Sequence, residues 1–395
     1  MASITFRGKE IEEQDVKVLK EIENITGKSI KVIDGTWLNK KTACTIQGNR
    51  VNALSLYECN IPKLPESLGN LSSLETLNVN RSTLKELPES IGNLNALKEI
   101  YFFKCRLTSL PNSIRNLTQL KYLRVRFNNL SMLPDSLENL KLLEVLNLDG
   151  NNFSTIPEVI GKVKSIKLLH LGHTPITEIP EYKLDLPNLT GLDLDHCELT
   201  SLPDAIGTFA ELSSLNLMYN KITELSKSIG NINTLKHLYL SHNKLCELPD
   251  TIGRLTELRT LLLDHNELNS LPDSIGNLTR LDELNLNHNQ LENLPETIGN
   301  LTALESLYVK KNRLTSVPES LGNLSKLKGF QLGNNRLTTL PDSLIVLNRL
   351  PSLEGNNFTS VPPVLEKLYK KIYGRDPKNY FKKSSKFGYN RSNHN

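Results

Sequence analysis

The sequence predicts an α/β solenoid, a curved stack of short repeats with a parallel β-sheet on its concave side. Two observations predict this class. Between Val51 and Arg349 the chain divides into thirteen units of 23 residues without an insertion. Within each unit, apolar residues first alternate with polar ones and then recur every three or four residues, which indicates a strand followed by a returning segment. Fixed-period self-similarity over such a length is typical of a solenoid.

The first element of each unit is predicted to be a short strand. Numbered from the first residue of a unit, positions 4 and 6 are apolar in every copy, as at Leu284 and Leu286, and mostly polar residues flank them. Proline at position 15, present in twelve units, forbids a long helix and predicts one short helical or 3₁₀ turn that begins at the proline. We expect glycine at position 19, present in nine units, to be the left-handed residue that ends this turn.

The units must stack in order to bury their apolar side chains. Each unit has seven inward apolar positions. Burial of each side chain is worth about 1.5–3 kcal/mol, so the same positions of the next unit must cover them. Stacking aligns the strands in a parallel sheet. Because the strands pack closer together than the bulkier returning segments, we predict a horseshoe whose concave side is the sheet and whose convex side carries the short turns and extended segments.

A structural asparagine ladder is predicted at position 9, where the chain turns after the strand. Backbone N–H and C=O groups in this bend have no partner in the sheet, and an inward amide can donate and accept for its own turn and for the neighbouring one. Five units have Cys, Ser or Thr instead, which gives Cys59, Cys105 and Cys197 the same structural role. The eight asparagines are Asn128, Asn151, Asn220, Asn243, Asn266, Asn289, Asn312 and Asn335.

Both ends of the array need caps, because an open end exposes a row of apolar side chains. Apolar residues at helical spacing between Val16 and Ile25 predict a capping helix within residues 9–26, and a turn at Gly48 predicts a hairpin that joins the first repeat. A fourteenth unit around Asn356 is two residues short. The predicted domains are the N-terminal cap at 1–50, the solenoid at 51–362, the C-terminal capping helix at 363–374 and a basic disordered tail at 375–395.

The repeat reads LxxLxLxxNxLxxLPxxIGxLxx between Leu281 and Ala303, and it resembles the leucine-rich repeat family. In particular it is similar to the 23-residue intracellular type found in Ras-associated scaffold and plant Ras-group proteins. The resemblance implies a horseshoe whose concave sheet binds protein partners, often in small-GTPase signalling. Trp37, Cys44 and Gly48 resemble the N-terminal cap of some plant repeat proteins, but the cysteine pair usual there is missing, so no cap disulfide is expected.

Histidine recurs at position 8, and neighbouring members of the row are predicted to lie about 5 Å apart. With Asp193, Asp195 and Asp264 nearby, two imidazoles and a carboxylate could hold Zn²⁺. Repetition explains the row more simply, because an evenly spread row is not a tetrahedral cluster. No HExxH, GxSxG, CxxC or EF-hand spacing occurs, and Gly27-Lys28-Ser29 lacks the first glycine of a P-loop. We therefore predict no catalytic residue, no metal, no cofactor and no enzymatic activity.

An aromatic and basic cluster on units three and four is the predicted anchor for a protein partner, because aromatic side chains and arginine are typical of interaction hot spots. Further along the sheet, an acidic patch is predicted at Asp149, Asp193 and Asp195 and a basic patch at Lys310, Lys311, Arg313 and Arg336. This alternation of sign favours a protein over a nucleic acid. The irregular sixth unit, residues 166–188, is interpreted as drift within a long array, with a hinge or binding feature as the alternative. The predicted partner-binding residues are Tyr101, Phe103, Lys104, Tyr122, Arg124, Arg126, Phe127, His170, Asp193, Asp195, His196, Tyr219 and Tyr239.

Composition predicts a cytoplasmic protein. The first ten residues are polar and resemble no secretion signal, and five cysteines without paired spacing favour reduced thiols. After Pro362 the chain has nine Lys and Arg and two acidic residues, a net charge of +7. This exceeds the net charge of +4 of the whole chain, so the excess positive charge lies in the tail. The predicted function is a monomeric scaffold or adaptor that binds one or more proteins, with small GTPases as candidates. The alternatives are recruitment to nucleic acid or an anionic membrane by the tail, and a metal-dependent hydrolase on the concave histidines.

Overall fold

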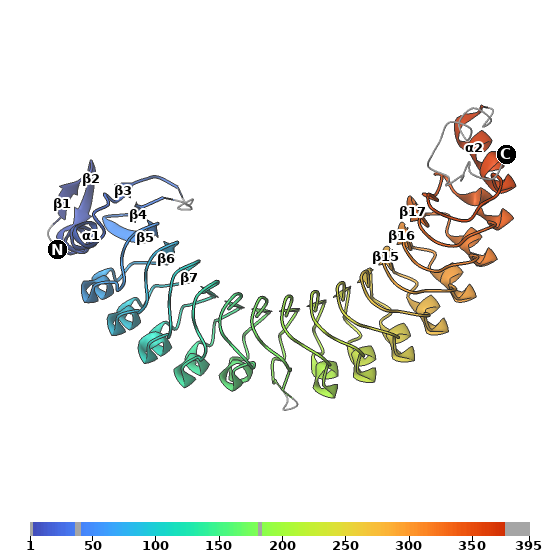
Figure 1. Cartoon of the computed structure of the whole chain (residues 1–395). Helices are drawn as coiled ribbons and strands as arrows, with labels where there is room; N and C mark the ends of the chain where they lie inside the picture. Colours follow the sequence, from blue (N-terminus) through green and yellow to red (C-terminus); the bar gives the residue numbers. More distant parts are fainter. Residues whose placement is uncertain (1–2, 36–40, 181–183, 376–395) are drawn as a thin grey trace. The chain divides into compact units, whose positions relative to one another are not determined.

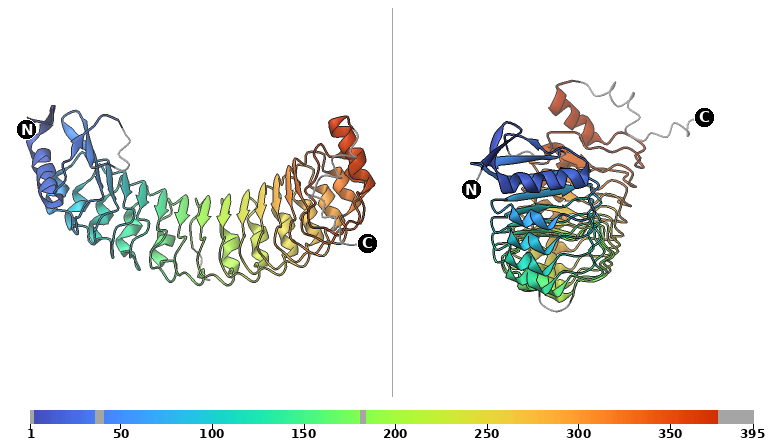
Figure 2. Two further views of the ribbon diagram at one scale, coloured as in Figure 1. Left: turned by 45° about the horizontal axis from the view of Figure 1, so that its top comes forward. Right: turned by 90° about the vertical axis from the view of Figure 1, so that its left-hand side faces the viewer.

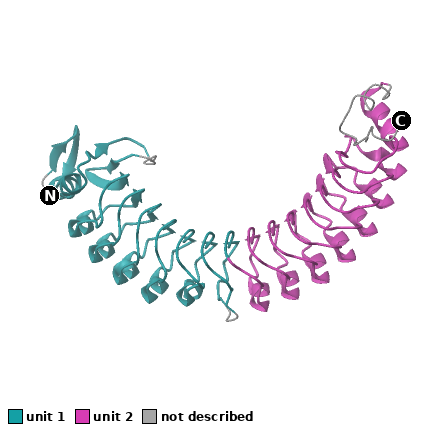
Figure 3. Cartoon of the chain, in the orientation of Figure 1, with its two compact units in different colours: residues 1–197 teal, residues 198–395 magenta. Residues whose placement is uncertain are grey.

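The computed structural model describes residues 3–35, 41–180 and 184–375. The chain divides into two compact units, residues 1–197 and 198–395 (Figure 3). Trp37 of the predicted cap, residues 181–183 of the sixth repeat and the predicted tail beyond Arg375 lie outside the described residues. Within the described residues, no helix is both long and apolar enough to cross a bilayer.

The N-terminal cap of the first unit begins with a hairpin. Strand β1 (Ser3–Phe6) pairs antiparallel with β2 (Lys9–Glu12), and helix α1 follows (Glu13–Thr26), lying across the end of the stack (Figure 2). The capping helix predicted within residues 9–26 is thus found at Glu13–Thr26, whereas Lys9–Glu12, at the start of the predicted range, form strand β2 of the hairpin. Ile25 is also 43% exposed and does not belong to the buried face of the helix.

A buried ion pair attaches α1 to the first repeat. Asp15 is fully buried, and its carboxylate accepts hydrogen bonds from Nε and Nη2 of Arg50 at 3.0 and 2.9 Å and from the backbone N–H of Val51 at 2.8 Å. Arg50 is the first residue of the second strand of the next hairpin, in which the turn at Gly48 has a φ of 63°. The hairpin strands are β4 (Ala43–Gln47) and β5 (Arg50–Tyr57), and β3 (Lys31–Val32) pairs parallel with β4.

The rest of the first unit repeats a strand and a 3₁₀ helix. From β5 onward its strands are parallel and in register, and they line the inner side of the stack, with the 3₁₀ helices on the outer side (Figure 1). The elements after β5 are η1 (Glu66–Asn70), β6 (Thr76–Asn80), η2 (Glu89–Asn93), β7 (Glu99–Tyr101), η3 (Asn112–Asn116), β8 (Tyr122–Arg124), η4 (Asp135–Asn139), β9 (Val145–Asn147), η5 (Glu158–Lys162), β10 (Leu168–His170) and β11 (Gly191–Asp193).

The second unit has the same plan and ends in a helix. Its strands are also parallel and in register, as at Leu284 opposite Leu307. The elements are η6 (Asp204–Thr208), β12 (Ser214–Asn216), η7 (Lys227–Asn231), β13 (His237–Tyr239), η8 (Asp250–Arg254), β14 (Thr260–Leu262), η9 (Asp273–Asn277), β15 (Glu283–Asn285), η10 (Glu296–Asn300), β16 (Ser306–Tyr308), η11 (Glu319–Asn323), β17 (Gly329–Gln331), η12 (Asp342–Val346) and α2 (Pro363–Tyr373). The predicted solenoid with a concave parallel sheet is confirmed in its fold class.

The core is the continuous stack of the seven apolar positions. In the repeat that starts at Leu281, six of these side chains are fully buried and Leu294 is 6% exposed. The proline at position 15 does not begin the 3₁₀ helix but precedes it. Pro295, for example, has an extended ψ of 149°, and its carbonyl accepts a hydrogen bond from the N–H of Ile298 at 3.0 Å.

Glycine at position 19 is not the left-handed residue that was predicted to end the turn. None of the nine position-19 glycines has a positive φ. Each lies within a 3₁₀ helix. A Cβ added at Gly276, for example, would come within 2.5 Å of the carbonyl oxygen of Thr297 in the next repeat. Eight of the nine glycines are needed for close stacking on the convex side rather than for a left-handed backbone; the exception is Gly161, where an added Cβ would meet its nearest neighbour at 3.6 Å.

Two repeats are irregular: they keep the inner part of the repeat but differ from the others in the segment that returns along the outer side. In the sixth repeat, the described residues between Lys162 and Asp204 contain no 3₁₀ helix, although β11 stays in register. At the C-terminal end, Asn356 accepts from Leu337, 19 residues earlier, whereas the regular separation is 21. This matches a fourteenth repeat that is two residues short. Helix α2 then packs on η12, with Val364, Leu365 and Leu368 buried.

Candidate functional site

Each strand of the repeats leads into a turn whose residue at position 8 has a left-handed backbone. The φ angles of the twelve residues other than glycine lie between 48° and 58°. This conformation costs an L-residue about 1–2 kcal/mol, so glycine would be the default. We call these positions the left-handed row: Glu58, Arg81, Lys104, Phe127, Gly150, His173, His196, Tyr219, His242, His265, His288, Lys311, Asn334 and Gly355.

The amide at position 9 explains how the turn is held in this conformation. In the eleventh repeat, Nδ2 of Asn289 donates to the carbonyl oxygen of Leu286 in its own turn at 3.1 Å and to that of Leu263 in the preceding repeat at 2.9 Å. Its Oδ1 accepts from the N–H of Leu268 at 3.0 Å. The side chain is only 8% exposed, so these bonds satisfy backbone groups that water does not reach.

The predicted asparagines all occupy this position and are all buried. In repeats without asparagine, smaller side chains make fewer bonds: Sγ of Cys105 donates to the carbonyl of Val79 at 3.0 Å, and that of Cys197 to the carbonyl of Leu171 at 3.4 Å. The ladder therefore fixes the path of the chain, and the side chains of the left-handed row project from it on the concave edge.

In the first unit, a guanidinium group lies against two tyrosine rings of neighbouring strands. The Cζ atom of Arg124 is 5.1 Å from the ring centre of Tyr101 and 5.0 Å from that of Tyr122. Nη1 of Arg124 donates to the hydroxyl of Tyr101 at 2.9 Å, and this hydroxyl donates to Glu99 at 3.0 Å. Burial, with the nearby Glu99 carboxylate, raises the pKa of Tyr101, so this phenol stays protonated.

A second cluster lies at the ends of the same strands. The rings of Phe103 and Phe127 meet edge to face with centroids 5.7 Å apart. Nζ of Lys104 lies 5.4 Å from the first ring centre and 5.7 Å from the second, and Cζ of Arg126 lies 6.0 and 5.8 Å from them. We call the two clusters together the aromatic–basic patch: Tyr101, Phe103, Lys104, Tyr122, Arg124, Arg126 and Phe127.

The acidic residues beyond the patch do not form the surface that the sequence analysis expected. Asp149 is only 7% exposed, and its Oδ1 accepts from the backbone N–H of Gly172 at 3.0 Å. Burial raises the pKa of Asp149, and Arg126 lies 3.3 Å from its carboxylate. Asp193 is partly exposed and lies 3.5 Å from Nδ1 of His170. Asp149 is thus a structural group of the turn rather than part of an acidic patch.

The histidines of the left-handed row form stacked columns, one in each unit. In the first unit His173 and His196 have ring centroids 4.3 Å apart, and Phe127 lies 5.9 Å from His173. In the second unit Tyr219, His242, His265 and His288 stack at 4.2, 4.1 and 4.0 Å. Tyr239 does not belong to this column. It lies on strand β13, with its ring centroid 6.2 Å from that of His237.

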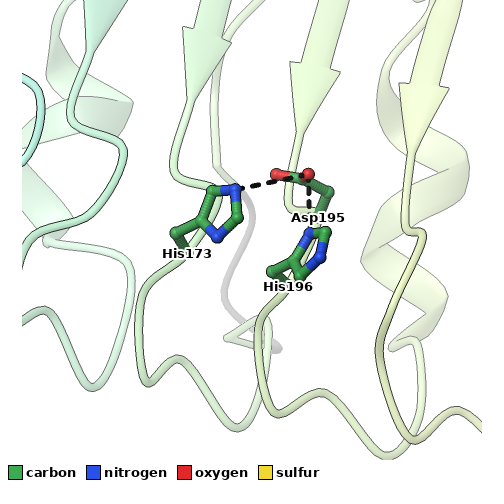
Figure 4. A group of neighbouring side chains, drawn as sticks. All are labelled: His173, Asp195 and His196. Carbon is green, nitrogen blue, oxygen red and sulfur yellow. Dashed lines mark hydrogen bonds and ion pairs between the residues drawn. The ribbon is translucent and has the colours of Figure 1, made fainter.

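A carboxylate lies between two histidines at two places in these columns. Figure 4 shows Asp195, whose Oδ2 is 2.9 Å from Nδ1 of His196 and 3.8 Å from Nε2 of His173. The same arrangement recurs as His242, Asp264 and His265 in the second unit. The row of histidines was predicted to hold no metal, because an evenly spread row is not a tetrahedral cluster. Repeat spacing alone does not show which carboxylates point into the column.

The chain is a solenoid repeat protein: its strands are parallel, buried asparagines hold the turns, and 3₁₀ helices lie in the returning segments. Similarity to known proteins identifies its family. A family model described as "Leucine-rich repeat region" matches residues 50–126 and 223–311, and one described as "Leucine rich repeat" matches residues 118–176 and 187–245. A leucine-rich repeat protein of Leptospira interrogans is 33% identical over 81% of this chain and 82% of its own, with a TM-score of 0.76. The chain belongs to the leucine-rich repeat family.

Solved complexes of plant receptors are also similar. The ectodomain of the Arabidopsis thaliana receptor kinase GASSHO1/SCHENGEN3, in complex with CASPARIAN STRIP INTEGRITY FACTOR 2, is 29% identical with a TM-score of 0.60. The match covers 81% of this chain and 42% of the receptor chain. A plant peptide hormone receptor in complex with RGF2 is 26% identical with a TM-score of 0.60, over 82% and 61% of the two chains. Comparison with curated proteins gives no match. Leucine-rich repeat proteins are typically non-enzymatic and bind other proteins.

Proposed function

We propose that the chain is a protein-binding scaffold and that a partner docks on the concave sheet of its first unit, with the aromatic–basic patch as the anchor. The observation that carries this proposal is the preorganisation of Arg124. Its guanidinium is fixed against Tyr101 and Tyr122 before any partner arrives. A side chain held in one conformation loses little entropy on binding, and arginine and tyrosine are enriched among hot-spot residues.

The charges of the patch indicate the chemistry of the partner. Among the described residues, no carboxylate lies within ion-pair distance of Lys104 or Arg124, whereas Arg126 is paired with Asp149. Two cations on aromatic faces therefore favour a partner that brings carboxylates together with apolar or aromatic side chains. A plant peptide hormone receptor of similar fold is solved in complex with RGF2, which supports a peptide or protein partner here.

The finer assignment rests on the 23-residue period. We propose that the chain is of the intracellular Ras-group type and acts as a monomer in the cytoplasm. The five free cysteine thiols support a reducing compartment. Small GTPases are therefore the first purified partners to test, each in its GDP-bound and GTP-bound form, because a signalling scaffold should distinguish the two.

The test compares a double variant within the patch, a charge reversal combined with loss of an aromatic ring, with a single charge reversal outside the patch. Partners captured by the wild-type chain are identified, and their Kd values are then measured with the double variant Arg124→Glu/Phe103→Ala and with Lys121→Glu. Lys121 is exposed and directly precedes Tyr122, outside the patch. We expect the double variant to weaken binding at least about 30-fold, since a hot-spot loss of about 2 kcal/mol corresponds to that factor, with Lys121→Glu within about twofold of wild type. Equal affinities for both variants would refute the site.

A further inference from the structure

We infer that the chain carries two equivalent sites for a divalent transition-metal ion, formed by His173, Asp195 and His196 and by His242, Asp264 and His265. Two imidazoles and one carboxylate are a common ligand set for zinc and related ions, and they leave a coordination position open. One site lies in each compact unit, so each is complete without the other. The inference does not depend on the aromatic–basic patch, since none of its six ligands belongs to it, although Asp195 and His196 are also among the predicted partner-binding residues.

The ligand atoms are close to the separations that a metal requires. In each site, one ligand atom from each of the three residues lies within 4.8 Å of the other two. Zinc bonds of about 2.0–2.1 Å in a tetrahedron place ligand atoms about 3.3 Å apart. In the first site the two measured separations from Asp195, 2.9 and 3.8 Å, fall on either side of this value (Figure 4).

A metal ion lies in the plane of the imidazole that binds it, so one ring of each stacked pair must turn. The rings of the first site are now within 19° of parallel and those of the second within 10°. Both rings of the first site are well exposed, at 44% and 40% of their side-chain surface, and solvent leaves room for this rotation.

The carboxylates are directed into the columns by small residues of the preceding repeat. A Cβ added at Gly172 would overlap Oδ1 of Asp195, so only glycine leaves room for this carboxylate. At the equivalent position of the second site, the hydroxyl of Ser241 donates to Oδ1 of Asp264 at 2.5 Å, and Nδ2 of Asn285 donates to the same oxygen at 3.0 Å. The other oxygen, Oδ2, faces Nδ1 of His265 at 3.0 Å. Such outer hydrogen bonds orient metal ligands.

The chain contains its own negative control. His265 and His288 stack at 4.0 Å, as the ligand pairs do, but the residue before His288 is Asn287, whose Oδ1 accepts from the N–H of Lys310 at 2.7 Å. Without a carboxylate this pair should not hold an ion. Asn334 shows that asparagine fits the left-handed row, with a φ of 55°. Exchange of histidine for asparagine therefore removes a ligand and preserves the turn.

The test titrates the purified, tag-free full chain with Co²⁺, followed by visible absorption, and then with Zn²⁺ in calorimetry. We expect two ions per wild-type chain, one in His173→Asn/His196→Asn, one in His242→Asn/His265→Asn, none in the fourfold variant and two in His288→Asn. Ser241→Ala should weaken the second site about tenfold and leave the first unchanged. Unchanged circular dichroism shows that the variants fold.

Three results would overturn the inference. They are the absence of saturable Co²⁺ or Zn²⁺ binding to the folded wild-type chain, full binding by the folded fourfold variant, and a loss in His288→Asn as large as in the ligand variants. Each result is independent of partner binding, so failure here would leave the proposed docking surface untouched.

Discussion

Replacement of a single ladder asparagine tests the physical account of the repeat most directly. Nδ2 of Asn312 donates to the carbonyl oxygens of Leu286 and Val309 at 2.9 and 3.2 Å, and Oδ1 accepts from the N–H of Leu291 at 3.0 Å. Asn312→Ala leaves these buried groups without a partner. Each unsatisfied buried group costs about 1–3 kcal/mol, so we expect a loss of about 3 kcal/mol.

Hydrogen exchange at single amides is the appropriate assay, because long repeat arrays open locally and do not unfold in one step. The amide of Leu291 should lose about 100-fold in protection, since each 1.4 kcal/mol is a factor of ten. The amide of Ile222, bonded to Asn243 at 3.0 Å several repeats away, serves as internal control. Asn300→Ala, at an exposed asparagine of the same repeat array, should change protection by less than about 0.5 kcal/mol.

A graded substitution separates hydrogen bonding from packing. Asn312→Cys introduces the residue that the chain uses at Cys105, where the thiol satisfies one carbonyl. We expect about half the loss seen for alanine. If Asn312→Ala exchanged no faster at Leu291 than Asn300→Ala, or if the cysteine and alanine variants were indistinguishable, the turn would be held by packing alone.

Two further predictions concern stacking and ionisation. Gly276→Ala places a Cβ within 2.5 Å of the Thr297 carbonyl, so hydrogen exchange of the amides around these two residues should show a local loss of about 1–3 kcal/mol, and unchanged exchange would contradict the stacking role of position 19. Burial raises the pKa of Cys44 to about 12, whereas an unfolded thiol ionises near pH 8.5. Because the folded chain binds this proton more tightly, the stability due to Cys44 is present below about pH 8.5 and is lost as pH rises toward 12; Cys44→Ala should flatten that decline, and an unaltered pH profile would count against it.

Sequence periodicity predicted the solenoid and its elements because every repeat applies the same constraint. Apolar alternation around Leu284 and Leu286 has one structural solution when thirteen copies must bury each other. Elements outside the regular repeats could not be predicted from periodicity. The β1–β2 hairpin is short and mostly exposed, so it leaves no apolar pattern that separates it from the start of α1.

The left-handed residue of the repeat could not be located from residue types. Glycine occurs in a sequence either because φ is positive or because a neighbour comes too close for a Cβ, and Gly276 is of the second kind. Most residues of the left-handed row, such as His288 and Lys311, are not glycines. Their conformation is imposed by the buried amide that follows them, which overrides their intrinsic preference.

The repeat pattern also did not predict the direction in which individual side chains point. Row spacing predicted neighbouring histidines about 5 Å apart, close to the observed stacking. It did not predict that Asp195 turns toward them while Asp149 turns inward to the backbone N–H of Gly172. These directions depend on rotamers and on small residues of adjacent repeats. Of the predicted partner residues of the first unit, Tyr101 and Tyr122 lie against Arg124, and others form the second cluster of the patch or lie on later strands. Their role remains to be tested by binding.

The shortened last repeat has a consequence for protein engineering. Gly355 and Asn356 keep the turn geometry of all earlier repeats although two residues are missing from the stretch before them. The strand-and-turn half of a module is therefore a fixed connector, and the outer half sets the module length. Modules of different length should be interchangeable at that connector, so arrays could be spliced, lengthened or re-curved without redesign of the inner lining.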